Sequence, residues 1–257
     1  MFLGEIYLMK DYTIVEECTL PSLGKIYTPK INPEVKLRSM TTVEEMRRLA
    51  PSEHTYKNLC ELIDDCMVEP IGMSVYDMHL ADYQYLLHRL RIVTYGVDYK
   101  YESSCPWCGQ TTNGEVDLTT FPIKYFEDGL FDNLVKFTLP VSKKEIEINI
   151  QTPRNVDNVN KLARDNKHRY SSSAESLFIY TLMSMIKTVD NEKLDAIQLE
   201  RFVKSLPMKD TNFIIKHAEK IVESFGMDTT LKVKCSGCGL DYTVPFRITS
   251  EFFSPTI

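Results

Sequence analysis

Four of the chain's seven cysteines occur in two motifs of the same form. They read Cys105-Pro-Trp-Cys108-Gly109 and Cys235-Ser-Gly-Cys238-Gly239. Two intervening residues allow both sulfurs of a pair to reach one ion, and four thiolates fill the tetrahedral shell of Zn²⁺ at about 2.3 Å per bond. The sequence therefore predicts a closed, structural zinc site formed by Cys105, Cys108, Cys235 and Cys238.

Each cysteine pair is expected at a turn between two strands. Alternating apolar residues precede and follow both pairs, at about 97–101 and 116–118 for the first, and at 231–233 and 240–248 for the second. The glycine after each pair tolerates the backbone geometry that brings amides close to the thiolates. These features are typical of zinc knuckles.

The two pairs lie far apart along the chain, with residues 109–234 between them. Compact zinc ribbons separate their pairs by about 15–20 residues. The entropy of loop closure grows only logarithmically with length, so the longer separation costs a few kcal/mol at most, against about 10–16 kcal/mol for zinc binding in finger peptides. We interpret residues 101–123 and 229–257 as two halves of one zinc ribbon, with residues 124–228 inserted between them.

A thiol oxidoreductase is the main alternative chemistry, because Cys-Pro-Trp-Cys resembles a dithiol motif. Reactive pairs of that kind normally lie at a helix N-terminus, whereas strands are expected on both sides of each pair here. Disulfides within the pairs, or cysteines without a metal, are the remaining alternatives. In a reducing compartment, paired spacing favours metal binding over disulfides.

The other candidate reactive groups show no catalytic pattern. Cys18, Cys60 and Cys66 fall near apolar positions and are expected to be small buried hydrophobes. The five histidines are not spaced as ligands, and no glycine-rich phosphate loop is present. We therefore expect no catalytic residues, no small-molecule substrate and no cofactor besides Zn²⁺.

Positive charge is concentrated in the N-terminal half. The residues that carry it are Arg38, Arg47, Arg48, His88, Arg89 and Arg91. An exposed basic face or a set of ion-pair partners is the default interpretation, and a contact surface for an acidic partner is the functional one.

The elements around the ribbon predict an α+β fold. The N-terminal arm and helical domain, residues 1–100, should contain short strands at 25–27 and 35–37, a helix that opens with a capping box at Thr42–Glu45, and helices at about 53–66 and 79–95. Residues 124–228 should form a β-hairpin, at 137–139 and 146–150, followed by amphipathic helices at 178–189, 199–206 and 214–225. The sequence thus predicts an N-terminal β/helical part and a zinc ribbon split by an inserted β-hairpin plus helical bundle.

Composition limits the function classes. The chain has 257 residues, 43% hydrophobic and 26% charged, with 36 acidic against 30 basic residues and a formal charge of −6. A net acidic chain is a poor candidate for a protein whose whole surface binds nucleic acid. The longest apolar stretch, residues 177–186, is too short for a membrane span, and no secretory signal opens the chain. We expect a soluble protein made in a cytoplasm.

The order of several motifs resembles a known family. These are Leu20-Pro-Ser-Leu-Gly24, Leu37-Arg-Ser-Met40-Thr-Thr, Asp82…Tyr85-Leu-Leu87…Leu90-Arg91-Ile92…Tyr95-Gly96…Tyr99 and Cys105-Pro-Trp-Cys108. Over residues 18–120 and 229–253 the chain is similar to the baseplate hub and hub-assembly proteins of contractile-tailed, T-even-like bacteriophages.

The resemblance implies a non-enzymatic structural or assembly protein of the phage tail. Its partners would be other baseplate hub, tail tube or spike proteins, and it would reside in the host cytoplasm during assembly and then in the virion tail baseplate. A zinc-ribbon regulator that binds nucleic acid is the alternative. The acidic balance counts against it, and so does the scarcity of lysine near the motifs, where only Lys100, Lys232 and Lys234 lie close.

Overall fold

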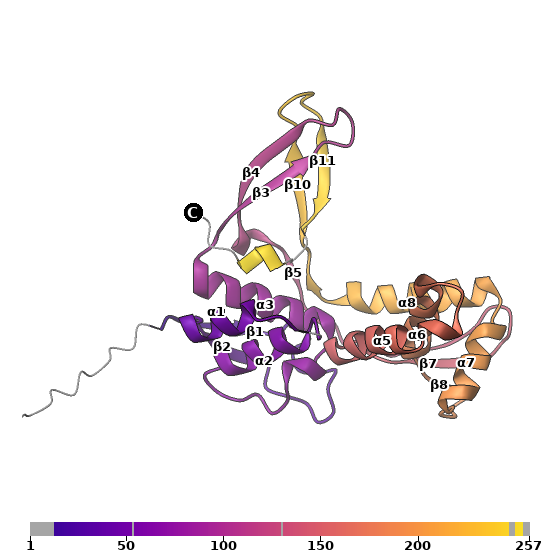
Figure 1. Cartoon of the computed structure of the whole chain (residues 1–257). Helices are drawn as coiled ribbons and strands as arrows, with labels where there is room; N and C mark the ends of the chain where they lie inside the picture. Colours follow the sequence, from indigo (N-terminus) through magenta and orange to yellow (C-terminus); the bar gives the residue numbers. More distant parts are fainter. Residues whose placement is uncertain (1–12, 53, 130, 247–249, 254–257) are drawn as a thin grey trace, which may run out of the picture.

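The computed structural model describes residues 13–52, 54–129, 131–246 and 250–253, and within them helices and small sheets alternate along the chain (Figure 1). The α-helices are α1 (Thr42–Leu49), α2 (Lys57–Cys66), α3 (Leu80–Tyr95), α4 (Phe131–Val135), α5 (Pro153–Asp165), α6 (Ser173–Met185), α7 (Ala196–Ser205) and α8 (Met208–Ser224). The strands are β1 (Val15–Thr19), β2 (Glu34–Arg38), β3 (Asp98–Ser104), β4 (Thr111–Asp117), β5 (Ile123–Lys124), β6 (Lys136–Thr138), β7 (Glu145–Ile148), β8 (Ile186–Val189), β9 (Gly226–Met227), β10 (Thr230–Lys234) and β11 (Asp241–Pro245). Short 3₁₀ turns are η1 (Val75–Asp77), η2 (Leu118–Thr120), η3 (Lys167–Arg169) and η4 (Ser250–Phe253). The predicted α+β class is confirmed.

Helix α3 is the centre of the N-terminal half. His79 begins it, because its ring Nδ1 accepts the backbone N–H of Ala81 at 3.1 Å. Gly96 ends it with φ of +89°, a value that favours glycine. The helix is buried around most of its circumference, against α2, the antiparallel β1–β2 pair and the 3₁₀ turn η4. The predicted helix at 79–95 and its glycine cap are therefore confirmed.

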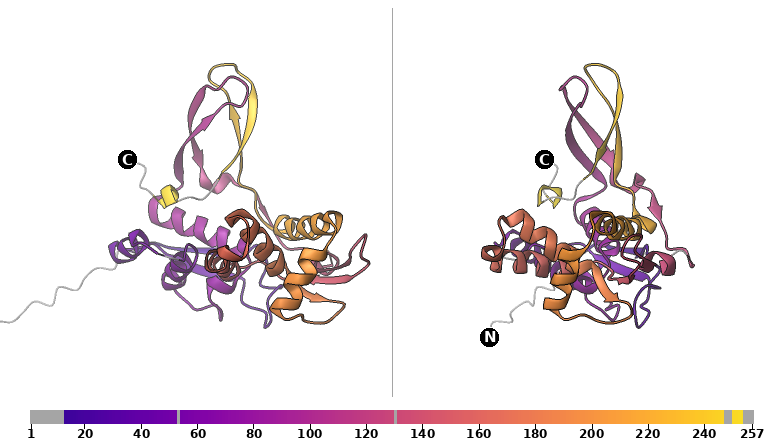
Figure 2. Two further views of the ribbon diagram at one scale, coloured as in Figure 1. Left: turned by 45° about the vertical axis from the view of Figure 1, so that its right-hand side comes forward. Right: turned by 90° about the vertical axis from the view of Figure 1, so that its right-hand side faces the viewer.

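Two antiparallel hairpins rise from this body. Strands β3 and β4 form one hairpin and β10 and β11 form the other, and each has its cysteine pair at the turn. In all views the hairpins run side by side away from the helices (Figures 1 and 2). The hydroxyls of Ser103 and Tyr242 join them at 2.8 Å, in a buried position. Apolar residues between the hairpins belong to the same core cluster as the N-terminal helices.

Residues 131–224 have a second core. The three-stranded antiparallel sheet β6-β7-β8 packs with helices α6, α7 and α8 around a separate apolar cluster that contains Leu139, Ile146, Leu182 and Ile214. The predicted β-hairpin and the helices that follow it are present. Strands β5 and β9, which pair at the two ends of this segment, place Lys124 opposite Gly226. The division of the chain that makes residues 124–228 an inserted unit stays a prediction. The β5–β9 pairing and the separate core support it.

One predicted helix was too long. The apolar spacing extended it from 178 to 189, but α6 ends at Met185 and the next four residues form strand β8. Ile186 and Val189 satisfy a helical spacing and are also β-branched, a type favoured in strands. Their backbone pairs with the free edge of β7, so tertiary pairing decides the structure.

Two further expectations near the N-terminus need correction. Residues 25–27 form a turn instead of a strand. Gly24 has φ of +66°, and Tyr27 is buried, where its hydroxyl donates a hydrogen bond to the Asp82 carboxylate. The capping box of α1 lies one residue earlier than predicted, with the Glu44 carboxylate accepting the Thr41 N–H at 2.8 Å. The N-terminal arm before Thr13, Glu53 and the predicted strand end at Ile248 lie outside the described residues.

A buried carboxylate on α5 contacts the N-terminal half of the chain. Asp157 of α5 is buried and accepts backbone N–H groups from Tyr56, at 3.2 Å, and Lys57, at 3.0 Å, where α2 begins. The Tyr76 hydroxyl donates to the same carboxylate at 3.1 Å. Because the first amides of a helix have no partner within it, Asp157 caps α2 from another part of the chain.

An ion pair lies beside this cap. Arg154, one turn earlier on α5, makes two hydrogen bonds to the Asp77 carboxylate, at 2.5 and 2.8 Å. Its guanidinium lies 4.4 Å from the centre of the Tyr76 ring.

Within the described ranges, none of the helices combines the length and the apolar character needed to cross a bilayer.

Candidate metal centre

The four cysteine sulfurs that the sequence singles out lie together at the turns of the two hairpins. Their Sγ atoms are all within 4.8 Å of one another. Across the hairpins, Cys105 Sγ lies 3.8 Å from Cys238 Sγ, and Cys108 Sγ lies 3.5 Å from Cys235 Sγ. None of the four is part of a disulfide. Hairpins that start more than 100 residues apart thus bring every predicted ligand to one place.

The backbone builds the same turn twice. In the first pair, the N–H of Cys105 donates to the Gln110 carbonyl at 2.9 Å, and the N–H of Gly109 donates to the Cys105 carbonyl at 2.9 Å. The second pair repeats both bonds. There Cys235 donates to Leu240 at 3.0 Å and Gly239 donates to Cys235 at 3.1 Å. The two motifs are therefore equivalent in structure as well as in sequence.

Glycine is required at the end of each motif. Gly109 has φ of +73° and Gly239 has φ of +74°, values at which a side chain would strain the backbone. A third glycine, Gly237, lies close to the other hairpin, where a Cβ would be 3.1 Å from the Gln110 side chain. The glycines thus permit both the tight turns and their close approach.

Backbone amides point at one of the sulfurs. The pKa of the Cys235 thiol lies well below its ordinary value, at about 6, because the N–H groups of Cys238, at 3.4 Å, and Gly237, at 3.3 Å, donate to the sulfur. Hydrogen bonds to the charged form favour a thiolate. A thiolate is the form that binds a metal.

Polar side chains join the two motifs beside the sulfurs. The hydroxyl of Thr112, on β4, lies 3.3 Å from that of Ser236 and accepts the Ser236 N–H at 3.4 Å. Cys105 and Cys235 are buried beneath the turns, whereas Cys108 and Cys238 face outward. Thr112 and Ser236 are not recognisable from the sequence, because no spacing rule identifies a hydroxyl that meets its partner across two hairpins.

The geometry fits a tetrahedral four-thiolate metal site. At about 2.3 Å per bond, the sulfurs of such a site stand about 3.8 Å apart, and the two cross-hairpin distances are 3.8 and 3.5 Å. A disulfide needs about 2.05 Å. Each pair also lies at a turn between strands. Redox-active dithiols are activated by a helix N-terminus, which neither turn provides. The cluster is therefore compatible with a metal site.

The other cysteines behave as the sequence predicts. Cys18, Cys60 and Cys66 are buried in the N-terminal core. Burial raises the pKa of Cys18 to about 12 and that of Cys66 to about 11, so both remain neutral thiols. They are core residues and take no part in the cluster.

The arginines of the N-terminal half form ion pairs and buried contacts. Four of them meet carboxylates, in the pairs Arg38–Glu44, Arg47–Asp65, Arg48–Glu45 and Arg89–Glu16. Arg91 is buried and donates to the carbonyl groups of Phe252, at 2.9 Å, and Gly96, at 2.8 Å. His88 is buried too. The ion-pair interpretation is confirmed for these four, and Arg91 adds nothing to a basic surface.

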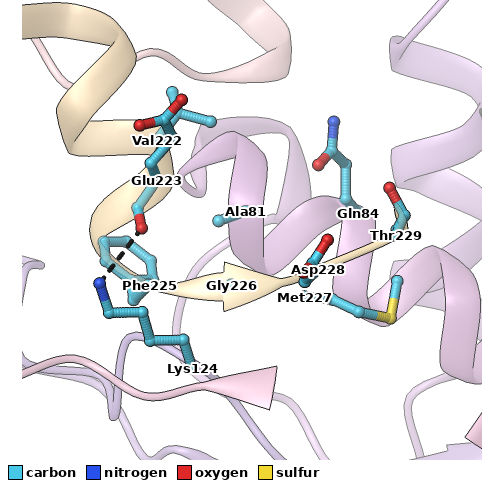
Figure 3. Close-up of a pocket in the computed structure, with 10 residues that line it drawn as sticks. All are labelled: Ala81, Gln84, Lys124, Val222, Glu223, Phe225, Gly226, Met227, Asp228 and Thr229. Carbon is cyan, nitrogen blue, oxygen red and sulfur yellow. Dashed lines mark hydrogen bonds between the residues drawn. The ribbon is translucent and has the colours of Figure 1, made fainter. Parts of the chain in front are cut away.

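A cavity of about 410 Å³ lies where the second core joins the body, between α3, β5, β9 and the end of α8. Figure 3 shows Lys124 at one side, with its ammonium on the Glu223 carbonyl oxygen at 3.5 Å, and Gln84 and Thr229 at the other. None of the residues that line it is a cysteine or histidine. Its polar groups do not converge on one point, so it is not the site indicated by the motifs.

Comparison with known proteins gives one result. No curated protein and no solved structure matches the chain. The model of one protein family, described as T4 bacteriophage base plate protein, matches residues 12–254. That range includes both hairpins with all four clustered cysteines, as well as the second core. The chain therefore belongs to the family of T4 bacteriophage base plate proteins, the structural proteins of the phage tail baseplate.

Proposed function

We propose that this protein is a non-enzymatic structural or assembly protein of the baseplate hub, held in shape by a structural zinc site. The family match over residues 12–254 carries the baseplate assignment. The hub assignment is narrower and rests on the motif order in residues 18–120 and 229–253. On this proposal the protein acts in the host cytoplasm during assembly and in the tail baseplate of the virion, where other hub, tail tube or spike proteins are its partners.

The zinc proposal rests on the ligand set. Four thiolates select soft or borderline ions, and tetrahedral sulfur coordination is typical of Zn²⁺ or iron. The cross-hairpin sulfur distances of 3.8 and 3.5 Å suit Zn²⁺. With four protein ligands the site leaves no open position for water, so its role is to hold the hairpins together.

A metal link suits a protein of this kind. The hairpins contact each other through the hydroxyl pairs Ser103–Tyr242 and Thr112–Ser236 and through apolar residues of the N-terminal core, whereas the cysteines meet at their far ends. A site of four thiolates closes that end without a disulfide, which a reducing cytoplasm would not maintain. The protein can then present one shape to its neighbours during assembly.

The nucleic-acid alternative gains no support from the charges near the site. Lys100 stands directly opposite Glu115 in the β3–β4 register, and Lys234 stands opposite Asp241 in the β10–β11 register. Cross-strand neighbours of opposite charge reduce the positive potential that phosphate binding requires. Retention on DNA that falls steeply with salt would favour the alternative.

Two measurements test the proposal. Mass spectrometry of purified phage particles, with stoichiometry, should find this protein among the baseplate components at a defined copy number. Its absence from particles and from every baseplate intermediate would contradict a baseplate role, whereas its presence in intermediates only would identify an assembly factor.

Elemental analysis of the purified chain should find one zinc per molecule. Less than half an equivalent of any transition metal, with freely alkylated thiols, would contradict the metal proposal.

A further inference from the structure

The far end of the hairpins has an unusual surface. We call residues 105–111 and 235–240, the two cysteine turns, the knuckle tip. None of these residues is Asp, Glu, Lys or Arg. Trp107 is 67% exposed and Leu240 is 52% exposed, so each of the two turns presents a large apolar side chain to solvent. The tip therefore combines exposed apolar side chains with an absence of lysine, arginine, aspartate and glutamate.

The tip is also the part of the molecule farthest from the helices. The hairpins carry it away from both cores (Figures 1 and 2), and the Trp107 side chain is exposed. Its backbone is fixed by paired turn hydrogen bonds and by the close approach of Gly237 to Gln110. A metal in the four-thiolate cluster would fix it further. The tip is thus a rigid, accessible projection.

We propose that the knuckle tip docks into an apolar pocket on another protein of the baseplate, with Trp107 as the anchoring side chain. The nature of the partner rests on the proposed function. Tryptophan is among the residues most enriched at the energetic centres of protein interfaces. A rigid projection loses little conformational freedom on binding, which favours affinity.

Charge argues for a protein pocket over nucleic acid. Four thiolates around a divalent ion carry a net charge of about −2, which repels phosphate. The nearest lysines, Lys100 and Lys234, stand opposite carboxylates in their hairpins. A pocket of apolar side chains, with amide or basic groups at its rim, complements a tip that combines exposed apolar side chains with the negative charge of the cysteine cluster.

The first experiment needs no substitution, because Trp107 is the only tryptophan in the chain. The full-length protein is produced with 5-hydroxytryptophan, which can be excited selectively in the presence of ordinary tryptophan. The probe is a preparation of baseplate intermediates from infections by a phage whose copy of this gene carries a stop codon. Acrylamide quenching of the label should be strong for the free protein and fall several-fold when the intermediates are added.

The second experiment measures affinity by co-sedimentation with the same intermediates. Trp107→Ala should weaken binding at least about 30-fold, the loss expected for a hot-spot residue. Ile197→Ala is the matched control, because Ile197 is 65% exposed, like Trp107, but lies on α7, away from the knuckle tip. This variant should bind as tightly as the unsubstituted chain. Metal content of the Trp107→Ala protein should be unchanged, since Trp107 is not a ligand.

The outcomes separate the possibilities. The protein could bind while acrylamide still quenches the label as strongly as it does in the free protein, or Trp107→Ala could bind as tightly as the unsubstituted chain. Either outcome overturns the tip inference and leaves the baseplate function intact. Protection that appears with protein concentration alone assigns the tip to a second copy of the chain, and protection by duplex or single-stranded DNA assigns it to nucleic acid. Either result overturns the inference. Failure of the unsubstituted chain to bind any intermediate contradicts both the inference and the proposed function.

Discussion

Cysteines of two kinds coexist in this chain, and their surroundings distinguish them. The three core thiols lie among apolar groups that hold them neutral, whereas backbone amides approach Cys235 and favour its thiolate. Position in the sequence already separates the two kinds, since only the clustered four occur as spaced pairs followed by glycine. The difference leads to a prediction for single substitutions.

Cys235→Ser should abolish metal binding and unfold the hairpin ends. A hydroxyl is a poor replacement for a thiolate ligand, and an open site loses much of the zinc-binding free energy, which is on the order of 10 kcal/mol in small zinc domains. Metal content is measured by elemental analysis and stability by thermal unfolding. Cys66→Ala is the control, because it should keep the metal and lose only about 1–2 kcal/mol from the core. Equal metal content in both variants would remove Cys235 from the ligand set.

Two buried histidines should make stability depend on pH. Burial lowers the pKa of His79 and of His88 to about 4, below the ordinary value of about 6.5. Between these values the unfolded chain binds more protons than the folded one, so stability falls as pH decreases from about 6.5 to 4, by roughly 3 kcal/mol for each ring.

Urea unfolding at a series of pH values measures this dependence. His79→Asn keeps a side chain that can accept the Ala81 N–H and removes the titrating ring, so its stability should fall less steeply with acid than that of the unsubstituted chain. Both proteins would release metal when their cysteines become protonated, so this effect cancels in the difference between their free energies of unfolding. Identical slopes would show that His79 does not titrate in this range.

Elements far apart in sequence depend on one another at their ends. Helix α2 has its first amides satisfied by Asp157 of α5, and strand β8 exists because β7 offers it an edge. Neither relation is visible in the local pattern. A carboxylate at a helical position is usually solvated, and the spacing of Ile186 and Val189 fits a helix as well as a strand.

Asp157→Ala should destabilise the protein by about 2–3 kcal/mol, because two backbone N–H groups and the Tyr76 hydroxyl lose a buried acceptor. Asp165→Ala, an exposed change at the end of the same helix, should stay within about 0.5 kcal/mol of the unsubstituted chain. Chemical denaturation of both variants gives the comparison. Similar losses in the two would mean that the cap across elements contributes little.

The described residues form two main apolar cores, which are joined by the β5–β9 pair and by contacts of α5 with α2 and η1. The N-terminal helices share one core with the hairpins, and residues 131–224 form the other. The chain leaves and re-enters the first core through paired strands β5 and β9, and the rings of Phe126 and Phe225 meet at this point, 5.9 Å apart. This arrangement makes a deletion feasible.

A chain in which residues 127–224 are replaced by a short glycine–serine linker should still bind one metal ion. Phe126 and Phe225 already lie in contact, so a short linker can join them, and a shorter loop lowers the entropy cost of closing the site. Stability should fall, because the partners of Asp157 and Arg154 lose their contacts. Zinc content and protection of the four thiols from alkylation are the measurements. A soluble deletion protein without metal would contradict the description of residues 124–228 as an insertion.

The sequence alone was sufficient for the four cysteines that cluster, the α+β class, most of the helices and the resemblance to baseplate proteins. These depend on short-range spacing, such as two residues between cysteines or an apolar residue every third or fourth position, which the chain carries locally. Tertiary structure decided the extent of β8, the burial of Arg91, the cap that Asp157 provides and the exposure of Trp107. Each depends on which surfaces meet after folding, and a buried arginine or an exposed tryptophan is defined by neighbours that are distant in sequence.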